Sequence, residues 1–331
     1  MLRRGGKSLT MAAAVGAVGC VVAFAAAGGA AGEGCKERHC GTHSTATTAT
    51  ATVEAARPLA IASPSSTAIA QTLFSSGFET GTYTPWTAAQ ASNYGNLNNT
   101  QMHFGSFNLD TQIVGQGRYS GRFQLPAWSG GRTRSQVYVG RPVNIGGDDY
   151  YSLMVYLPTG FTTGTSSFWG VSIAELNFQS LGIGGPTIAL QAHSDHVTLA
   201  MQTGVATTTF PNYAYRSNAD STGSPNLPPL YAIPRPMKLG VWHELVIHAH
   251  WATSKTGLVE VWHRLKGQTS WTKTVSLGGV PTLQTNANGS YPPYGLDVIQ
   301  AYRAASTAPV TVWLDGFSRT TSFNAAAANM P

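Results

Sequence analysis

The sequence predicts an all-β fold, a sandwich of two antiparallel sheets. Helical periodicity is scarce along the 331 residues, whereas Gly, Thr, Ser and Tyr are abundant and short runs of alternating residues recur between turn signals. In the clearest run, 242–251, Leu245, Ile247 and Ala249 alternate with polar or mixed neighbours. A second run, 257–265, repeats the alternation after a short Ser/Lys/Thr/Gly segment, so the two runs predict a β-hairpin with one apolar face.

The N-terminal segment has the pattern of an export signal. Basic residues within the first seven positions precede an apolar run, 11–31, so residues 1–31 predict a secretory signal peptide. A single transmembrane anchor is the alternative, because the run approaches the ~20 residues that a span needs. Residues 17–20 also faintly resemble a lipoprotein cleavage box. The next segment, 32–70, is rich in Thr, Ala and Ser and predicts a disordered extracellular spacer.

The cysteines fit an exported protein. If Cys20 leaves with the signal peptide, Cys35 and Cys40 remain and could close a small disulfide in an oxidising compartment. A metal site that adds His39 and His43 is the alternative. No cysteine follows Cys40, so the folded part does not depend on disulfides.

Residues 71–325 are long enough for one large β domain with a sizeable core. The formal net charge of the whole chain is +6, which is modest and does not indicate a nucleic-acid surface. Arginine outnumbers lysine in the folded part, and guanidinium groups bind carboxylates and sulfates through two parallel hydrogen bonds. The composition therefore favours an anionic ligand other than nucleic acid.

Several predicted strands gather polar or aromatic side chains on one face, which makes a poor core and a good sugar-binding surface. In the run 131–138 these residues are Arg132, Arg134, Gln136 and Tyr138. In the run 171–179 they are Glu175, Asn177 and Gln179. In the run 297–303 they are Gln300 and Tyr302, followed by Arg303, and on a further run Gln191 and His193 share a face. A solvated outer face is the plain alternative.

The motif W-H-E-L-V-I-H-x-x-W followed by G-L-V-E-V-W, residues 242–262, resembles the jelly-roll polysaccharide lyases of the heparin lyase I type. Arg134-Ser135-Gln136-Val137 resembles the R-S-E-L strand of alginate-lyase jelly rolls, with Gln136 in place of Glu. Residues 297–303 resemble the K-x-G-x-Y strand of that family, although Val298 and Gln300 replace the Lys and Gly. The resemblance implies a concanavalin-like jelly roll of two antiparallel sheets that cleaves a uronic-acid polysaccharide by β-elimination.

The resemblance also implies roles for individual residues. Arg134 would hold the substrate carboxylate and Tyr302 would be the catalytic acid or base. Where the family has Q-x-H, this chain has Glu175-Leu176-Asn177, so Asn177 stands where the family has its proton-abstracting His. Either His193 or His103 supplies the base, or the protein binds glycans without cleaving them. The expected catalytic residues are Tyr302, Arg134, Asn177 and His193, and the expected substrate-binding residues are Arg132, Gln136, Tyr138, Glu175, Gln179, Gln191, Trp262, Gln300 and Arg303.

The chemistry of elimination explains these residue types. The C5 proton of a uronate becomes acidic only when its carboxylate charge is neutralised, so hydrogen bonds from Arg, Gln or Asn stabilise the charge that develops. A Tyr or His then moves the proton. A retaining glycosidase needs two Glu about 5 Å apart, normally supplied by the motif E-x-D-x-x-E on one strand. No Glu of the folded part lies in such a motif.

The sequence requires no cofactor, although Glu79 and Asp315, near the first and last strands, could share a structural Ca²⁺. The first and last strands are expected to be neighbours. We expect a secreted monomer that acts on an acidic polysaccharide and contacts neither nucleic acid nor, after signal cleavage, a membrane. A non-catalytic glycan-binding module is the second interpretation, and a structural surface protein is the third.

Overall fold

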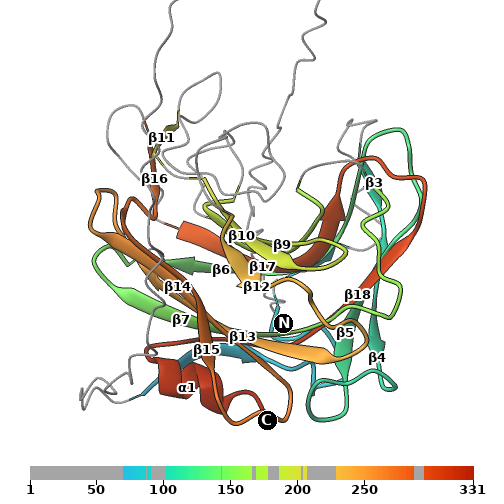
Figure 1. The fold of residues 1–331 in the computed structure, drawn as a ribbon, viewed down its shortest axis with the longest axis horizontal. Helices are drawn as coiled ribbons and strands as arrows, with labels where there is room; N and C mark the ends of the chain where they lie inside the picture. Colours follow the sequence, from blue (N-terminus) through green and yellow to red (C-terminus); the bar gives the residue numbers. More distant parts are fainter. Residues whose placement is uncertain are drawn as a thin grey trace, which may run out of the picture. The chain divides into compact units, whose positions relative to one another are not determined.

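A computed structural model describes residues 70–86, 88–90, 102–142, 144–165, 169–177, 186–202, 204–206, 229–286 and 294–331. They form two eight-stranded sheets, here called sheet A and sheet B, which face each other across an apolar core (Figure 1). The prediction of an all-β sandwich is confirmed. The predicted signal peptide, the spacer up to residue 69 and Gln179 lie outside the described residues.

Sheet A contains the predicted hairpin at residues 242–265. Its strand order is β15-β14-β13-β7-β18-β5-β4, and β1 also pairs with β18. The strands are β15 (Thr272–Val280), β14 (Gly257–Leu265), β13 (Trp242–His250), β7 (Asp148–Tyr156), β18 (Val310–Thr320), β5 (Ser120–Leu125), β4 (Ser106–Asp110) and β1 (Thr72–Ser76). Strands β13 and β14 pair antiparallel from His243 opposite Leu265 to His250 opposite Leu258, as the alternation predicts.

Sheet B contains the predicted polar strands. Its order is β12-β10-β9-β8-β17-β6-β2, and β3 pairs parallel with β6. The strands are β12 (Tyr231–Ile233), β10 (Val197–Met201), β9 (Ile188–Ala192), β8 (Val171–Asn177), β17 (Tyr294–Arg303), β6 (Arg132–Pro142), β2 (Ala88–Gln90) and β3 (Met102–Phe104). A separate parallel pair joins β11 (Gly204–Ala206) to β16 (Gln284–Asn286).

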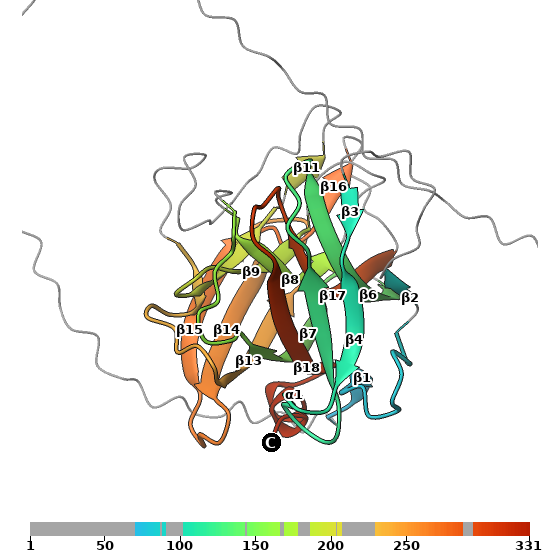
Figure 2. The same ribbon diagram turned by 90° about the vertical axis from the view of Figure 1, so that its right-hand side faces the viewer.

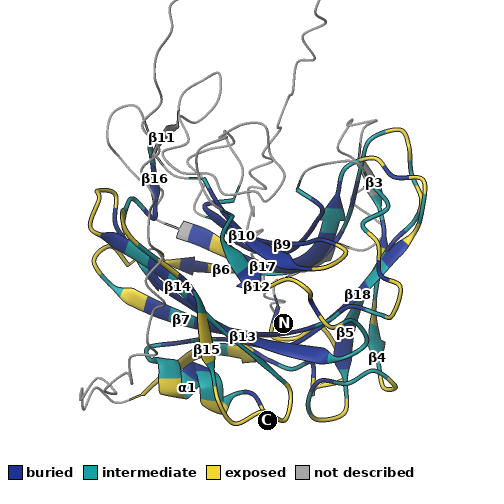
Figure 3. Ribbon diagram, viewed as in Figure 1, coloured by how far each residue is buried: buried dark blue, intermediate teal, exposed yellow. Residues whose placement is uncertain are grey.

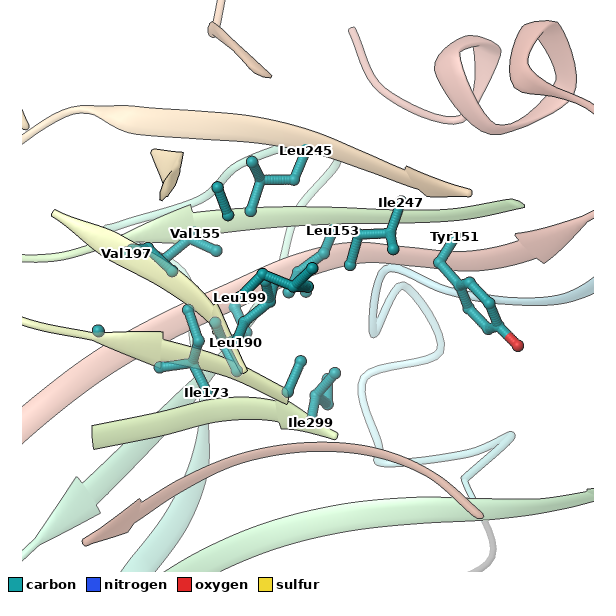
Figure 4. Close-up of a cluster of buried hydrophobic side chains, with 14 of the residues drawn as sticks. Tyr151, Leu153, Val155, Ile173, Leu190, Val197, Leu199, Leu245, Ile247 and Ile299 are labelled. Atoms are coloured by element: carbon teal, nitrogen blue, oxygen red, sulfur yellow. The ribbon is translucent and has the colours of Figure 1, made fainter. Parts of the chain in front are cut away.

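The core lies between the two sheets, where alternate residues of each strand meet. Leu245 and Ile247 of β13 approach Leu190 of β9 and Ile299 of β17, and each of these side chains is at most 3 % exposed (Figure 4). Burying one such side chain stabilises a fold by about 1.5–3 kcal/mol. The period of two that fills the core turns the intervening residues of β6 and β17 to the outer face of sheet B. Figure 3 shows buried residues along the strands of both sheets.

A buried ionic cluster also joins the sheets. The Arg141 guanidinium of sheet B donates to Asp297 on the neighbouring strand and, over 3.1 Å, to Asp149 of sheet A. Trp251 and Tyr151 donate to the same oxygen of Asp149, over 2.7 and 3.3 Å. Because these charges are almost fully buried, each needs its partners to offset the loss of hydration.

The two ends of the domain meet in sheet A, as expected for its first and last strands. β1 pairs antiparallel with the end of β18, from which helix α1 (Phe323–Ala328) leaves. Figure 2 shows β1 close to this helix. The sequence did not predict α1, which begins after the N-cap Ser322 and packs on the outer face of sheet A through Phe323 and Ala326. No helix within the described ranges is long and apolar enough to cross a membrane.

Candidate active site

Polar side chains line up across the outer face of sheet B. Directly paired residues of neighbouring strands lie on the same face, with Cβ atoms about 5 Å apart. One such row crosses five strands and consists of Arg134, Tyr302, Ser172, Gln191 and Thr198. Strand pairing therefore places the predicted residues Arg134, Tyr302 and Gln191 in one row. Beside this row, Gln300 pairs with Gln136.

Tyr302 has a cation and an aromatic ring against its phenol ring. The guanidinium carbon of Arg134 lies 4.2 Å from the centre of the Tyr302 ring. The Trp169 ring centre lies 5.0 Å from that of Tyr302, at 35° between planes. Nε of Arg134 is buried and has no hydrogen-bond partner among the described residues. The arrangement holds a guanidinium group directly beside a phenol.

A hydrogen-bond chain runs from Gln300 through Ser172 to Glu175. Nε2 of Gln300 donates to the Ser172 hydroxyl over 3.1 Å, and that hydroxyl donates to Oε1 of Glu175 over 3.1 Å. The amide oxygen of Gln300, Oε1, is buried and has no partner in the described part of the chain. A fully buried amide with an unused acceptor is costly in a folded protein, so a hydrogen bond donated to this oxygen would be favourable.

Ser172 is a site residue that alternation along β8 does not predict. An unbroken period of two would turn Ser172 toward the core, because Glu175 is three residues away. The register between β8 and β9 shifts between Ser172 and Ala174, so Ile173 and Ala174 both enter the core. This irregularity places Ser172 beside Glu175 on the outer face. The alternation also does not predict Trp169, because this residue precedes β8.

The histidine candidates differ in their surroundings. His193 follows β9; its Nε2 lies 3.3 Å from the Thr198 hydroxyl, and its ring stacks on His196 at 4.4 Å. Because Thr198 ends the polar row, His193 lies at the border of the site. The backbone of His103 pairs with Thr133, on the edge strand beside Arg134.

Asn177 lies too far from Tyr302 to act on the same sugar. Asn177 pairs with Leu296, six residues from Tyr302 along β17, which is about 20 Å in an extended strand. The structure therefore does not bring the predicted catalytic residue Asn177 together with Tyr302. Its Oδ1 is buried and has no partner among the residues described, so it remains a candidate for binding a distant sugar.

Two expected substrate-binding residues lie elsewhere. Trp262 is in β14 of sheet A, where Phe323 lies 4.9 Å from its ring and Lys273 4.8 Å. Alternation gives the face of a strand but not the sheet to which the strand belongs, so Trp262 does not lie with Arg134 and Tyr302. Arg303 follows Tyr302 and therefore points the opposite way. It is fully buried and donates to the carbonyl oxygens of Thr163, Pro126 and Ala308.

The remaining predicted residues lie on the outer face. Arg132 and Tyr138 alternate along β6 with core-facing Val137 and are partly exposed, and Tyr138 pairs with Val298, which pairs with Glu175. Glu175 is thus in a row next to Gln300, and it is 5 % exposed.

Glu79 and Asp315 accept hydrogen bonds from the backbone of one loop near the start of the domain. Asp315 accepts from the amides of Gly115 and Gln116 over 3.0 and 2.9 Å, and Glu79 accepts from that of Arg118 over 2.8 Å. Burial raises the pKa of the Asp315 carboxyl to about 7, and the charge of Glu79 adds to this effect. A buried carboxyl that resists ionisation beside a second carboxylate suits a hard cation.

The comparisons with known proteins agree with this fold. The endo-β-1,4-glucuronan lyase of the fungus Trichoderma reesei shares the fold: it is 17 % identical, with a TM-score of 0.53 over 76 % of this chain and 97 % of that chain. Two other similar structures are the cellulose-induced protein Cip1 (19 % identity, 75 % and 97 % coverage, TM-score 0.44) and the PL-14 alginate lyase of Aplysia kurodai (15 %, 65 % and 87 %, TM-score 0.42). No curated protein matches the chain. The family model described as polysaccharide lyase matches residues 78–318, nearly the whole sandwich, and the chain therefore belongs to the polysaccharide lyase family.

Proposed function

We propose that this lyase is secreted and cleaves a uronic-acid-containing polysaccharide by β-elimination on the outer face of sheet B. The observation that carries the proposal is the stacking of Arg134 on Tyr302 within a row of polar side chains. The solved glucuronan lyase with the same fold acts on a uronate polymer, which supports a substrate of this class.

The reaction assigns a role to each group. Arg134 binds the uronate carboxylate and stabilises the charge that develops on it as the C5 proton leaves. The bond between C4 and the glycosidic oxygen breaks as the C4–C5 double bond forms. Tyr302 takes the proton from C5 as the phenolate and gives it to the leaving oxygen as the phenol. A proton lost from C5 is regained by the leaving oxygen, so neither water nor a redox cofactor is consumed.

The test is to incubate the purified protein with uronate polymers and record ultraviolet absorbance. Each cleavage creates an unsaturated uronate, so absorbance should rise with time. The replacement of Q-x-H by Glu175-Leu176-Asn177 favours a second function, glycan binding without cleavage. Binding of a polymer with no absorbance rise would select that function and contradict ours.

We further propose that residues 1–31 are removed during export and that residues 32–70 form the spacer. This rests on the basic residues and apolar run of the N-terminal sequence. N-terminal sequencing of the protein from the culture medium should find a start at or near residue 32. An intact N-terminus in the membrane fraction would show an anchor instead.

We also propose a structural Ca²⁺ held by Glu79 and Asp315, where it would brace the loop 115–119. A cation between the two carboxylates would offset their mutual repulsion and the burial of Asp315, which together raise the pKa of that carboxyl. Removing calcium with a chelator should lower the melting temperature, and added Ca²⁺ should restore it. In Asp315→Asn the melting temperatures measured with the chelator and with added Ca²⁺ should coincide. An unchanged melting temperature of the wild-type protein would contradict the proposal.

A further inference from the structure

Glu175 is a buried carboxylate without a cation. It is only 5 % exposed and forms no ion pair with any described residue. The neutral hydroxyl of Ser172 is its hydrogen-bond donor, over 3.1 Å. Its neighbours in paired strands, Val298 and Ala189, are apolar. Burying a carboxylate with one neutral donor is unfavourable, so its presence requires another contribution, which a ligand can supply.

The other unsatisfied groups near Glu175 are also acceptors. Oε1 of Gln300 and Oδ1 of Asn177 are buried and lack donors among the described residues. In contrast, the arginines of this face, Arg132 and Arg134, both belong to β6. One part of the face thus offers donors and positive charge, and the part around β8 offers acceptors and negative charge.

The two parts are offset from each other on this face. β6 and β8 flank β17, so Arg134 and Glu175 belong to strands two spacings apart, about 10 Å. Glu175 pairs with Val298, four residues from Tyr302 along β17, and its Oε1 reaches back to the Ser172 hydroxyl opposite Tyr302. A polymer that places one uronate on Arg134 would therefore bring its next sugar against Glu175.

We propose that the sugar against Glu175 is neutral, so that the substrate is a polysaccharide in which uronate alternates with an uncharged sugar. Hydroxyl or amide hydrogens of a neutral sugar satisfy the acceptors of Glu175 and Gln300, and Asn177 would meet a more distant sugar. A uronate in the same place brings a second carboxylate against a buried one, which is repulsive at low effective dielectric. This inference rests on the proposed elimination at Tyr302.

The first experiment compares polymers with the wild-type enzyme. Hyaluronan and unsulfated chondroitin alternate glucuronate with an uncharged amino sugar derivative, whereas glucuronan and alginate consist of uronates alone. All four carry the leaving oxygen on C4 of a uronate. The alternating polymers should be cleaved with a kcat/KM at least about tenfold higher, the ratio expected for one carboxylate repulsion near the surface.

The second experiment removes the charge. Glu175→Gln should raise kcat/KM on glucuronan about tenfold and so reduce the preference for the alternating polymers, whereas Glu175→Asp, which keeps the charge, should retain that preference. Circular dichroism checks that both variants fold. Equal or better cleavage of glucuronan by the wild-type enzyme would overturn this inference and leave the proposed function intact. Unsaturated product from none of the four polymers would overturn both.

Discussion

At the scale of single residues, the contact between Arg134 and Tyr302 makes elimination feasible. Both residues are placed by register, because they pair directly across β6 and β17. A guanidinium 4.2 Å from the phenol ring can bind a carboxylate whose C5 proton lies near the phenolic oxygen. In the proposed mechanism, neutralisation and proton transfer thus occur at one sugar, which is what the weak acidity of the C5 proton demands.

The two residues should fail in different ways when replaced. Tyr302→Phe removes the transferable proton and little binding surface, so kcat should fall about 10²–10⁴-fold with KM nearly unchanged. Arg134→Ala removes a contact present in both the bound state and the transition state, so it should raise KM and lower kcat. Steady-state absorbance assays on one polymer measure both constants.

Trp262→Phe is the matched control for these variants. Trp262 is an aromatic residue of the opposite sheet and packs against Phe323, so its replacement should leave both constants within about twofold of the wild-type values. Full activity in Tyr302→Phe would remove Tyr302 from the mechanism and direct the search to His193 and His103.

At the scale of elements, alternation predicts the face of a strand but neither its sheet nor its irregularities. Arg134, Gln300 and Tyr302 were predictable, because β6 and β17 pair without a register shift. Ser172 was not, because a bulge in β8 reverses the alternation at Ile173. Trp262 follows the predicted alternation and nevertheless lies in the other sheet, since which strands become neighbours depends on long-range packing.

The short helix α1 illustrates a second limit of prediction from the local sequence. Its six residues, Phe-Asn-Ala-Ala-Ala-Ala, are too few to establish a helical period, although Ser322 is a suitable N-cap. The helix is stabilised by packing on Trp262 and Trp271, which the local sequence does not reveal.

The start of β8 depends on Gly170. Its φ is +56°, and a Cβ there would lie 2.3 Å from the carbonyl oxygen of Ala192 and 3.2 Å from Nδ1 of His193. Gly170→Ala should therefore displace the turn that carries Trp169, destabilise the fold by more than about 1 kcal/mol and lower kcat. Denaturant unfolding and the absorbance assay measure these effects.

Gly160→Ala separates backbone strain from the close contact. Gly160 has a φ of +77°, and a Cβ added there would meet no atom of the described residues within 4 Å, so the strain is similar and the collision is absent. We expect a cost of about 1 kcal/mol in unfolding free energy and unchanged activity. Equal effects of the two substitutions would show that the contact with Ala192 is unimportant.

At the scale of the whole molecule, stability should depend on a pair of neutral histidines in sheet A. Nε2 of His243 donates to the Lys238 carbonyl over 2.8 Å, and its Nδ1 accepts from His263 over 2.9 Å. Burial lowers the pKa of His263 to about 4, against an ordinary value of 6.5, and His243 contributes to this shift. Between these pH values His263 is protonated more in the unfolded chain than in the folded protein. Acidification at this residue therefore lowers the free energy of unfolding.

His263→Gln tests this dependence, because an amide can still donate to His243 but does not titrate. The loss of unfolding free energy between pH 6.5 and 4 should be smaller in the variant than in the wild type, by on the order of 1–2 kcal/mol. The pH dependence of the unfolding free energy must be compared between the variant and the wild type. The raised pKa of Asp315 makes acidification increase this free energy over an overlapping pH range, and it does so in both proteins. Identical pH profiles would refute the role of His263.

The central claim is that the outer face of sheet B cleaves a uronate polymer without adding water. The most direct measurement is mass spectrometry of the oligosaccharides released from unsulfated chondroitin and glucuronan in ¹⁸O-labelled water. Elimination predicts unsaturated non-reducing ends, no ¹⁸O introduced by bond cleavage, and loss of these products in Tyr302→Phe. Saturated ends with ¹⁸O at the cleaved bond would indicate hydrolysis, and intact polymer bound to the protein would indicate a glycan-binding module; either result would contradict the account.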